Sequence, residues 1–287
     1  MKRALTAGFC LGLGVLACVV RDESTQITIA FASETAVPSE LDDLTVKITD
    51  ARGSVTYLND YEVRDPAFFP TTLAVVPAND ESFEGPIRVE VEGRGAKGAV
   101  RLQRSAILAY SKGRNLLLPM PLRMACVNFP DCGAGRTCRG GQCVDAIVGD
   151  TELRDFVETE VFARPGGACF DEAACLRGAA RVDVSADCTF PMAGDGNVAL
   201  VWEAAPTRLL LLTAGDAQEG WTRQSPERGQ LSRGACVSLL DPETDVQKRE
   251  VPDRALEVFV ADACPEKTAA VPYCPAADGH SGIGAAH

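Results

Sequence analysis

Apolar and polar side chains alternate along most of the first hundred residues that follow position 25. In the segment IRVEV, residues 87–91, the apolar side chains fall on one side of an extended chain and the charged side chains on the other. A strand with one buried face has this pattern. About seven such segments follow one another without helical periodicity. They span residues 25–32, 44–50, 54–58, 71–76, 86–93, 99–108 and 114–120. The series predicts a β-sandwich over residues 25–122.

Strand-like segments return in the last third of the chain, where we predict a second β-domain over residues 179–274. They span residues 180–186, 197–204, 208–214, 235–240 and 255–261. The predicted fold class is therefore mainly β, with an immunoglobulin- or fibronectin-like sandwich first and a disulfide-stapled β-domain second. Residues 123–178 would form a cysteine-rich spacer and linker between them.

One segment of that linker has two interpretations. In residues 151–162, Leu153, Val157 and Val161 lie four positions apart, which is typical of a short amphipathic helix. The charges of the same segment would equally suit an exposed linker.

The N-terminus has the pattern of an export signal. Lys2 and Arg3 precede an apolar run from Ala4 to Ala17, which is too short to span a bilayer. We therefore predict a signal peptide over residues 1–17, followed at Cys18 by a mature chain that begins with a short tether, residues 18–24.

The residues Val15-Leu16-Ala17-Cys18 resemble the lipobox of bacterial lipoproteins. The resemblance implies that Cys18 is lipidated and anchors the chain to a membrane. Val19 stands where some lipoproteins carry an aspartate that retains them in the inner membrane, so the outer membrane or cell surface is favoured. An ordinary thiol at Cys18, or an uncleaved segment, are the alternatives.

Cysteine parity supports lipidation. The chain has 12 cysteines; Cys10 would leave with the signal, and a lipidated Cys18 leaves an even number for disulfides. The disulfide candidates are Cys126, Cys132, Cys138, Cys143, Cys169, Cys175, Cys188, Cys236, Cys264 and Cys274. The preferred pairs are local ones: Cys126–Cys138, Cys132–Cys143 and Cys264–Cys274. A zinc site is the alternative for the first four cysteines, but their spacing is wider than that of usual zinc ligands.

The glycine-rich stretch CGAGRTCRGGQCVD, residues 132–145, resembles the small EGF-like segments of cysteine-rich bacterial surface lipoproteins. In those proteins such a segment follows a β-domain and acts as a spacer. The resemblance covers about 30 residues and implies an architecture, not an activity.

Charge narrows the choice of partners. The net charge is −12, and loss of Lys2 and Arg3 would make it about −14. A field of this sign repels nucleic acid. The expected partners are the membrane, through the lipid anchor, and envelope proteins or glycans.

Catalytic motifs are scarce. The only histidines, His280 and His287, lie in a small-residue tail, residues 275–287, that we expect to be disordered. The sequence GRGAKG, residues 93–98, matches a dinucleotide-binding pattern, but a strand-like segment follows it, so we interpret it as a hairpin turn. We therefore predict no catalytic residue, no metal site and no cofactor.

Two weaker signals keep other functions open. Glu203 beside Trp202, and Glu219 close to Trp221, could supply the paired carboxylates of a hydrolase. We expect Trp202 on a core face and Trp221 in an exposed turn, where it could contact a glycan. The leading hypothesis is a non-catalytic envelope lipoprotein with a structural or interaction role. A carbohydrate- or peptidoglycan-binding lipoprotein is the second hypothesis, and an acidic-residue hydrolase is the third.

Overall fold

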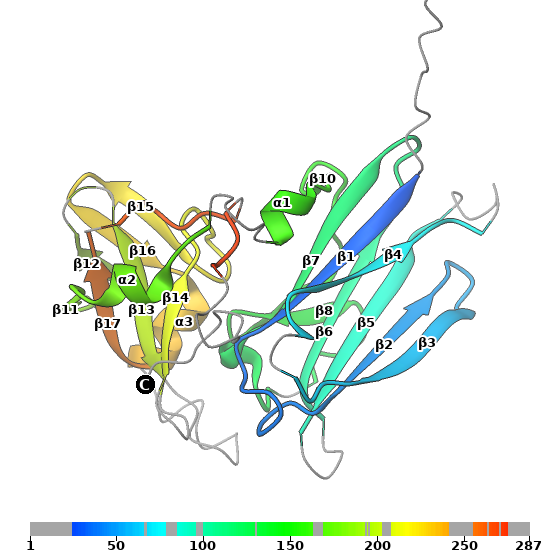
Figure 1. Cartoon of the computed structure of the whole chain (residues 1–287), viewed down its shortest axis with the longest axis horizontal. Helices are drawn as coiled ribbons and strands as arrows, with labels where there is room; N and C mark the ends of the chain where they lie inside the picture. Colours follow the sequence, from blue (N-terminus) through cyan, green and yellow to red (C-terminus); the bar gives the residue numbers. More distant parts are fainter. Residues whose placement is uncertain are drawn as a thin grey trace, which may run out of the picture.

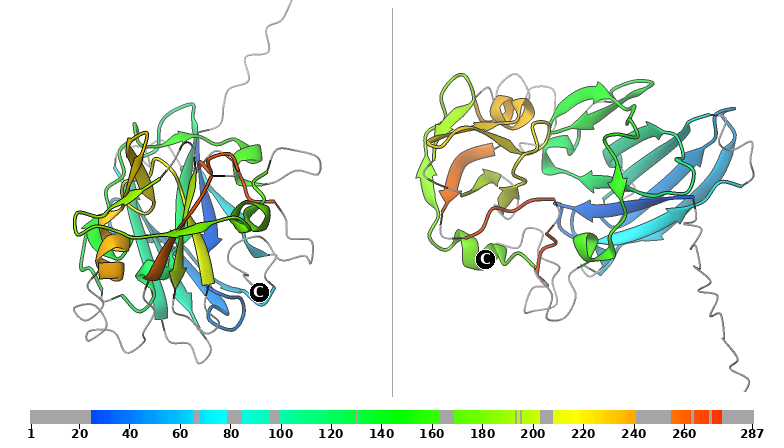
Figure 2. Two further views of the ribbon diagram at one scale, coloured as in Figure 1. Left: turned by 90° about the vertical axis from the view of Figure 1, so that its left-hand side faces the viewer. Right: turned by 90° about the horizontal axis from the view of Figure 1, so that it is seen from above.

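We describe the fold from a computed structural model of the chain (Figure 1). The structure describes residues 25–65, 68–78, 85–95, 100–129, 131–162, 169–192, 194, 196–202, 208–240, 255–262, 264–269 and 271–274. These residues form two β-rich lobes that lie side by side (Figures 1 and 2). The predicted mainly-β class is confirmed. The predicted signal, tether and tail lie outside the described residues.

The N-terminal lobe is a sandwich of two four-stranded sheets. Its strands are β1 (Gln26–Ser33), β2 (Asp43–Thr49), β3 (Val55–Glu62), β4 (Thr71–Val75), β5 (Ile87–Arg94), β6 (Val100–Leu108), β7 (Asn115–Leu122) and β10 (Arg154–Asp155). One sheet has the order β10-β7-β1-β4 and the other β3-β2-β5-β6. Every strand predicted in this part of the chain is present.

The pairing of β1 makes the strand order of the sandwich different from that of an immunoglobulin domain. β1 runs antiparallel to β4 but parallel to β7, so the first strand lies beside the seventh. The constant-type immunoglobulin domain has strands ABED in one sheet and CFG in the other. The two-layer architecture is thus the predicted one, with a different strand order.

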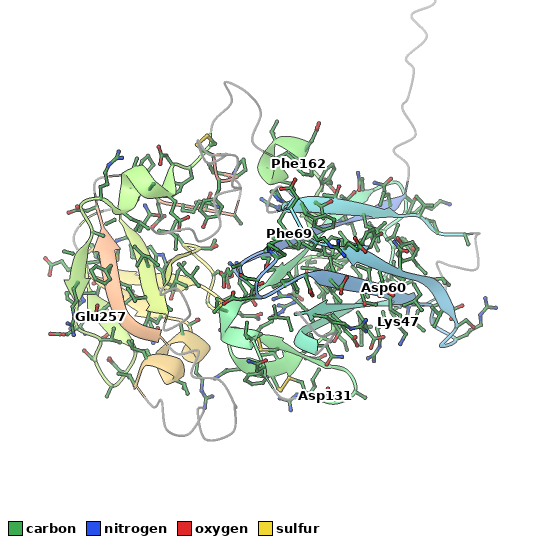
Figure 3. The ribbon with its side chains drawn as sticks, turned by 60° about the horizontal axis from the view of Figure 1, so that its bottom comes forward. Lys47, Asp60, Phe69, Asp131, Phe162 and Glu257 are labelled. Atoms are coloured by element: carbon green, nitrogen blue, oxygen red, sulfur yellow. A yellow bond between two sulfur atoms is a disulfide. The ribbon has the colours of Figure 1, made fainter. Side chains whose placement is uncertain are left out.

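Alternation along each strand builds the core. Ile27 and Ile29 of β1, Val46 of β2 and Val89 of β5 are fully buried members of one apolar cluster. Complete burial of a side chain of this size contributes about 1.5–3 kcal/mol. Charged residues occupy alternate positions in β5 and part of β2; Figure 3 labels Lys47 of β2, and Asp60 of β3, on this lobe.

The glycine-rich stretch at residues 93–98 joins the antiparallel strands β5 and β6. The hairpin interpretation is therefore confirmed, although residues 96–99 lie outside the described residues. No helix follows the glycines, because residues 100–108 form the strand β6.

The C-terminal lobe contains two smaller sheets and two short helices. Its elements are α2 (Glu172–Leu176), β11 (Ala180–Val182), β12 (Thr189–Pro191), β13 (Asn197–Trp202), β14 (Arg208–Leu212), β15 (Trp221–Ser225), β16 (Arg228–Leu231), α3 (Arg233–Leu240) and β17 (Ala255–Ala261). The sheets have the orders β11-β17-β13-β14 and β12-β16-β15.

One predicted strand of this lobe is wrong. Residues 235–240 belong to helix α3, in which Cys236 N donates to Ser232 O at 3.0 Å. Ala235 and Cys236 are buried whereas Leu240 is 45% exposed. A short apolar segment can suit either a strand or a helix, and here the helix packs its first turn against the cysteine-rich segment.

The cysteine-rich segment is hydrogen-bonded to the sandwich. It forms a hairpin of β8 (Arg136–Arg139) and β9 (Gln142–Asp145). Ser105 N of β6 donates to Thr137 Oγ1 at 2.9 Å, and Ile107 N donates to Ala146 O at 2.8 Å. The predicted disulfides Cys126–Cys138 and Cys132–Cys143 are both present.

The third predicted disulfide, Cys264–Cys274, is wrong. Cys274 is bonded to Cys169, and Cys264 to Cys175. The last described residues return to the start of the lobe, where Phe170 N donates to Pro272 O and Cys274 N donates to Phe170 O. This pairing places Cys274 opposite Cys169 rather than near Cys264. The fifth disulfide, Cys188–Cys236, joins the residue before β12 to α3.

The segment 151–162 forms two short elements. Arg154–Asp155 is strand β10, paired with β7, and Glu158–Val161 is the single-turn helix α1. Leu153 is buried whereas Val157 is 44% exposed. The chain therefore packs along the sandwich here and does not present one apolar helical face.

Candidate functional site

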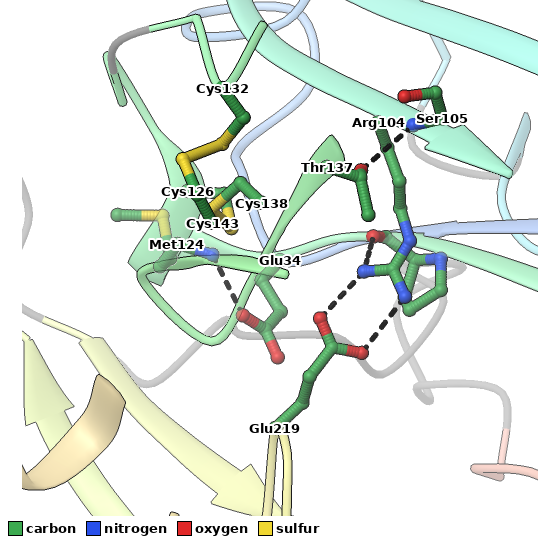
Figure 4. Close-up of a disulfide and its surroundings, with 11 residues drawn as sticks. Glu34, Arg104, Ser105, Met124, Cys126, Cys132, Thr137, Cys138, Cys143 and Glu219 are labelled. Carbon is green, nitrogen blue, oxygen red and sulfur yellow. Dashed lines mark hydrogen bonds and ion pairs between the residues drawn. A yellow bond between two sulfur atoms is a disulfide. The ribbon is translucent and has the colours of Figure 1, made fainter. Parts of the chain in front are cut away.

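A buried ion pair joins the two lobes. Arg104, on β6, donates from Nη1 and Nη2 to the two carboxylate oxygens of Glu219, at 2.6 and 3.1 Å (Figure 4). Both side chains are less than a tenth exposed. Burial alone would raise the pKa of Glu219, but Arg104 and then Arg123 outweigh it and lower the pKa. The carboxylate form of Glu219 is therefore stabilised by Arg104 and Arg123.

A second ion pair flanks the first. Arg123 Nη1 donates to Glu34 Oε1 at 2.5 Å, and Met124 N donates to Glu34 Oε2 at 2.8 Å. Burial works to lower the pKa of Arg123, but the carboxylates of Glu34 and Glu219 raise it. Together these groups form the polar part of the boundary between the lobes, which we call the seam.

Close backbone packing between α3 and the cysteine-rich hairpin also occurs at the seam. A Cβ atom added to Gly234, in α3, would lie 1.2 Å from the carbonyl oxygen of Gly140, in the β8–β9 turn. Next to this contact, Arg139 Nη1 donates to Gln218 Oε1 at 2.6 Å. The cysteine-rich hairpin therefore contacts both lobes.

Three further titratable groups lie in the C-terminal lobe near the seam. Lys267 is 5% exposed; its Nζ donates to Thr268 O at 2.7 Å and lies 4.6 Å from the ring centroid of Tyr273. Burial lowers the pKa of Lys267 to about 8 and raises the pKa of Glu172 to about 7. Burial also raises the pKa of Tyr273. Shifted pKa values of this kind occur at functional sites and in structural ion networks.

A groove opens on the flank of the N-terminal sandwich, on the lobe's own surface. It is a cavity of about 540 Å³ between the edge strands β3 and β4. Its lining residues are Ile48, Asp50, Ala51, Arg52, Thr56, Tyr57, Leu73, Ala74, Val75, Val76, Ala78, Gly85, Ile87 and Tyr110. We call this cavity and the adjoining faces of β3 and β4 the flank groove.

The walls of the flank groove follow from strand register. Tyr57 pairs with Ile48, which is buried, so the Tyr57 side chain points between the sheets. On the opposite wall, Leu73 pairs with the buried Ile29 and Val75 with the buried Ile27. These side chains are only partly buried because the flank beside them is open.

Tyrosines give the groove polar atoms within an apolar wall. The hydroxyls of Tyr57 and Tyr61 are hydrogen-bonded to each other. Burial, followed by this hydrogen bond, raises the pKa of Tyr57 to about 12. At neutral pH the Tyr57 hydroxyl is therefore uncharged and can still hydrogen-bond to a ligand.

A second, smaller cavity of about 270 Å³ lies between the outer face of the β5–β6 sheet and the cysteine-rich segment. Arg88 and Glu90 line it from β5, and Asp131 and Arg136 line it from the cysteine-rich segment. The charged side chains of its lining are two basic and two acidic residues, so the cavity presents no single electrostatic sign.

The structure contradicts the proposed glycan contact at Trp221. This residue is 0% exposed and packs edge-on against Phe190, with ring centroids 6.2 Å apart. Trp221 O accepts from Gly215 N and Trp221 N donates to Thr213 O, which fixes the residue inside the lobe. An exposed turn is therefore the wrong environment for Trp221.

The other sequence candidates divide into two groups. All ten disulfide candidates are paired. Cys18, His280, His287, Glu203 and the side chain of Trp202 lie outside the described residues. Within the described part of the chain, no three His, Cys, Asp or Glu side chains are grouped closely enough to hold a metal ion. Among the same residues, no helix has the length and apolarity needed to cross a bilayer.

The flank groove and the seam were not foreseen from the sequence. Tyr57 and Leu73 each fall at a regular strand position, and nothing in either segment indicates that the two strands are edges of facing sheets. No family model, curated protein or solved structure matches the chain at a significant level.

Proposed function

We propose that the chain is an exported, lipid-anchored envelope protein that has no catalytic role and binds a partner through the flank groove. The observation that carries this proposal is the groove itself, a partly apolar cavity with tyrosine hydroxyls. Its volume lies within the range of ligand sites, about 300–1,000 Å³.

Disulfides support the exported location. Bridges persist in oxidising compartments outside the cytosol, and the described residues contain five of them. The membrane anchor is the finer part of the proposal and depends on Cys18. Several acyl chains on one cysteine would hold the protein stably, whereas a single chain gives only marginal binding.

The surroundings of Glu219 and Glu172 favour a binding role over hydrolysis. Glu219, one of the carboxylates considered for catalysis, is committed to Arg104 and is not free to act on a substrate. Glu172 has a pKa of about 7, as a general acid requires. However, Glu172 lines neither of the two cavities described above.

A photo-crosslinking amino acid placed in the full chain tests the groove as the binding site. Val76 lines the flank groove and is 59% exposed; Ile147, near the cysteine-rich hairpin, is 62% exposed and is the matched control position. In the source cells, the probe at Val76 should yield a discrete envelope adduct that the probe at Ile147 does not. Identical adducts at both positions, or none at Val76, would contradict the proposal.

Metabolic labelling with a lipid precursor tests the anchor. The wild-type chain should incorporate label and fractionate with membranes, and Cys18→Ala should do neither. Equal labelling of the two chains would contradict lipidation at Cys18 and leave the groove proposal intact.

A further inference from the structure

The backbone of β3 is the first element of a partner site. β3 is eight residues long and, in the described part of the chain, pairs only with β2. An edge strand directs alternate N–H and C=O groups outward and acts as a template for another strand. The natural complement of such an edge is a second extended backbone.

The inner face of β3 specifies apolar side chains in that complement. Tyr57 and Tyr61 point between the sheets and pack against the core. Leu73 and Val75 of β4 form the facing wall. Successive side chains of a strand alternate between its faces, so a strand added beside β3 would direct every second side chain into the flank groove.

The outer face of β3 specifies positive charge. Asp60 and Glu62 lie on this face with side chains 69% and 71% exposed. Their ion pairs are long, 3.8 Å from Asp60 to Arg94 and 3.4 Å from Glu62 to Arg64. Opposite charges directly across a strand pair stabilise it, and like charges destabilise it.

The net charge of the whole chain also favours a basic partner. A second copy of this protein would have the same net charge of −12 and the same acidic outer face. Mutual repulsion therefore disfavours pairing of β3 with itself. A basic segment, in contrast, is attracted by the negative charge of the chain.

We propose, on the basis of the binding role assigned to the flank groove, that β3 pairs with an extended polypeptide segment in which apolar residues alternate with lysine or arginine. The apolar residues occupy the groove between β3 and β4. The basic residues lie on the outer face beside Asp60 and Glu62. Backbone hydrogen bonds to β3 join the segment to the sheet.

Binding of a model peptide to the full chain tests this pairing. The probe is a short, fluorescently labelled peptide in which lysine alternates with valine and leucine. Two control peptides are used: one with the same composition and the lysines grouped together, and one with glutamate in place of lysine. The alternating lysine peptide should bind at least about tenfold more tightly than either control, because only it satisfies both faces of β3.

Variants of the protein locate the binding site. Asp60→Lys combined with Glu62→Lys should weaken binding of the lysine peptide by about tenfold and improve binding of the glutamate peptide. Asp155→Lys is the matched control, since Asp155 is 66% exposed, is also paired with an arginine, and lies on the other sheet. It should change the affinity less than about twofold. Amide hydrogen exchange should show new protection in β3 in the wild type.

Three outcomes would overturn the inference. The first is equal binding of the alternating and grouped lysine peptides, and the second is equal loss of binding in the Asp60/Glu62 and Asp155 variants. The third is a concentration-dependent dimer that loses its stability in the Asp60/Glu62 variant without any peptide binding, which would make a second copy the partner. A discrete crosslink at Val76, which lines the flank groove, together with any of these results would leave the proposed function standing and reject only the peptide class.

Discussion

Arg104 and Glu219 form an ion pair between residues that are far apart in the sequence. They are 115 residues apart in the chain, yet Arg104 donates two hydrogen bonds to Glu219 inside the seam. Neither residue has a neighbour in sequence that predicts the contact. Glu219, whose position close to Trp221 suggested catalysis, instead forms an ion pair that joins the C-terminal lobe to β6.

Replacing one residue of this ion pair should lower the free energy of unfolding more than replacing both residues. Glu219→Ala leaves the Arg104 guanidinium buried without a counter-charge, so the free energy of unfolding should fall by about 3–5 kcal/mol. Replacement of both residues by methionine should cost much less, because no unpaired charge remains. Urea denaturation measures both values. A loss of less than about 1 kcal/mol in Glu219→Ala would show that the seam relaxes and solvates Arg104.

Glu172 predicts a pH dependence of stability. Its pKa is raised from 4.5 to about 7 in the folded state, chiefly by burial. The folded protein therefore binds a proton that the unfolded chain releases between about pH 4.5 and 7, and stability falls as pH rises through this window. The shift corresponds to about 1–3 kcal/mol of lost stability above pH 7.

Glu172→Gln should remove this slope and stabilise the protein above pH 7. The measurement is the free energy of unfolding in urea from pH 5 to 8, compared between wild type, Glu172→Gln and the exposed control Glu62→Gln. A slope that persists in Glu172→Gln would assign the pH dependence to another group.

At the scale of elements, alternation predicted the N-terminal lobe well. Most of the segments that form β1 to β7 have clear apolar faces, and local turn residues separate them. The edge strands β3 and β4 are the exceptions, since neither contains a buried residue. The C-terminal lobe was harder, because β15 and β16 carry mostly polar residues and contain a register shift between Arg223 and Ser225. Their pairing buries Trp221, which its sequence neighbours Glu219 and Gly220 had placed in an exposed turn.

Pairing between distant elements explains the remaining errors. The local disulfides of the cysteine-rich hairpin were predictable, since a short loop can close in only a few ways. Cys264 and Cys274 are also close in sequence, but the return of residues 272–274 to Phe170 separates them. The flank groove is likewise a property of sheet order, which places β3 and β4 at facing edges.

The contact of α3 with the β8–β9 turn supplies an element-level prediction. The carbonyl oxygen of Gly140 occupies the space that a Cβ atom of Gly234 would need, so Gly234→Ala must push the helix and the hairpin apart. We expect a destabilisation of about 1–3 kcal/mol. Gly178→Ala is the control, because no atom lies within 4 Å of its added Cβ and its φ is not positive. Equal thermal stability of the two variants would show that this backbone contact is not tight.

At the scale of the whole molecule, the C-terminal lobe is closed by nested disulfides. Cys169–Cys274 spans 105 residues and encloses Cys175–Cys264, which spans 89. While the inner bridge is intact, the outer one closes a loop of only about 16 residues. Its contribution should therefore be about 3 kcal/mol, and not the about 4.7 kcal/mol of an unnested loop of this length.

Paired serine substitutions test the nesting. Cys169→Ser with Cys274→Ser should lower the free energy of unfolding by nearly the same amount as Cys132→Ser with Cys143→Ser, whose bridge spans 11 residues. The loss at Cys169 and Cys274 should become larger in a background that also lacks Cys175 and Cys264. Equal losses in the two backgrounds would mean that the bridges act independently.

The parallel pairing of β1 with β7 has a mechanical consequence. β1 begins at Gln26 and lies between β4 and β7, bonded to both. A force applied through the preceding residues, as from a membrane anchor, pulls along the axis of β1. That direction shears both ladders at once, so their hydrogen bonds share the load instead of opening one after another. The strand nearest the proposed anchor is thus hydrogen-bonded to a neighbouring strand on each side.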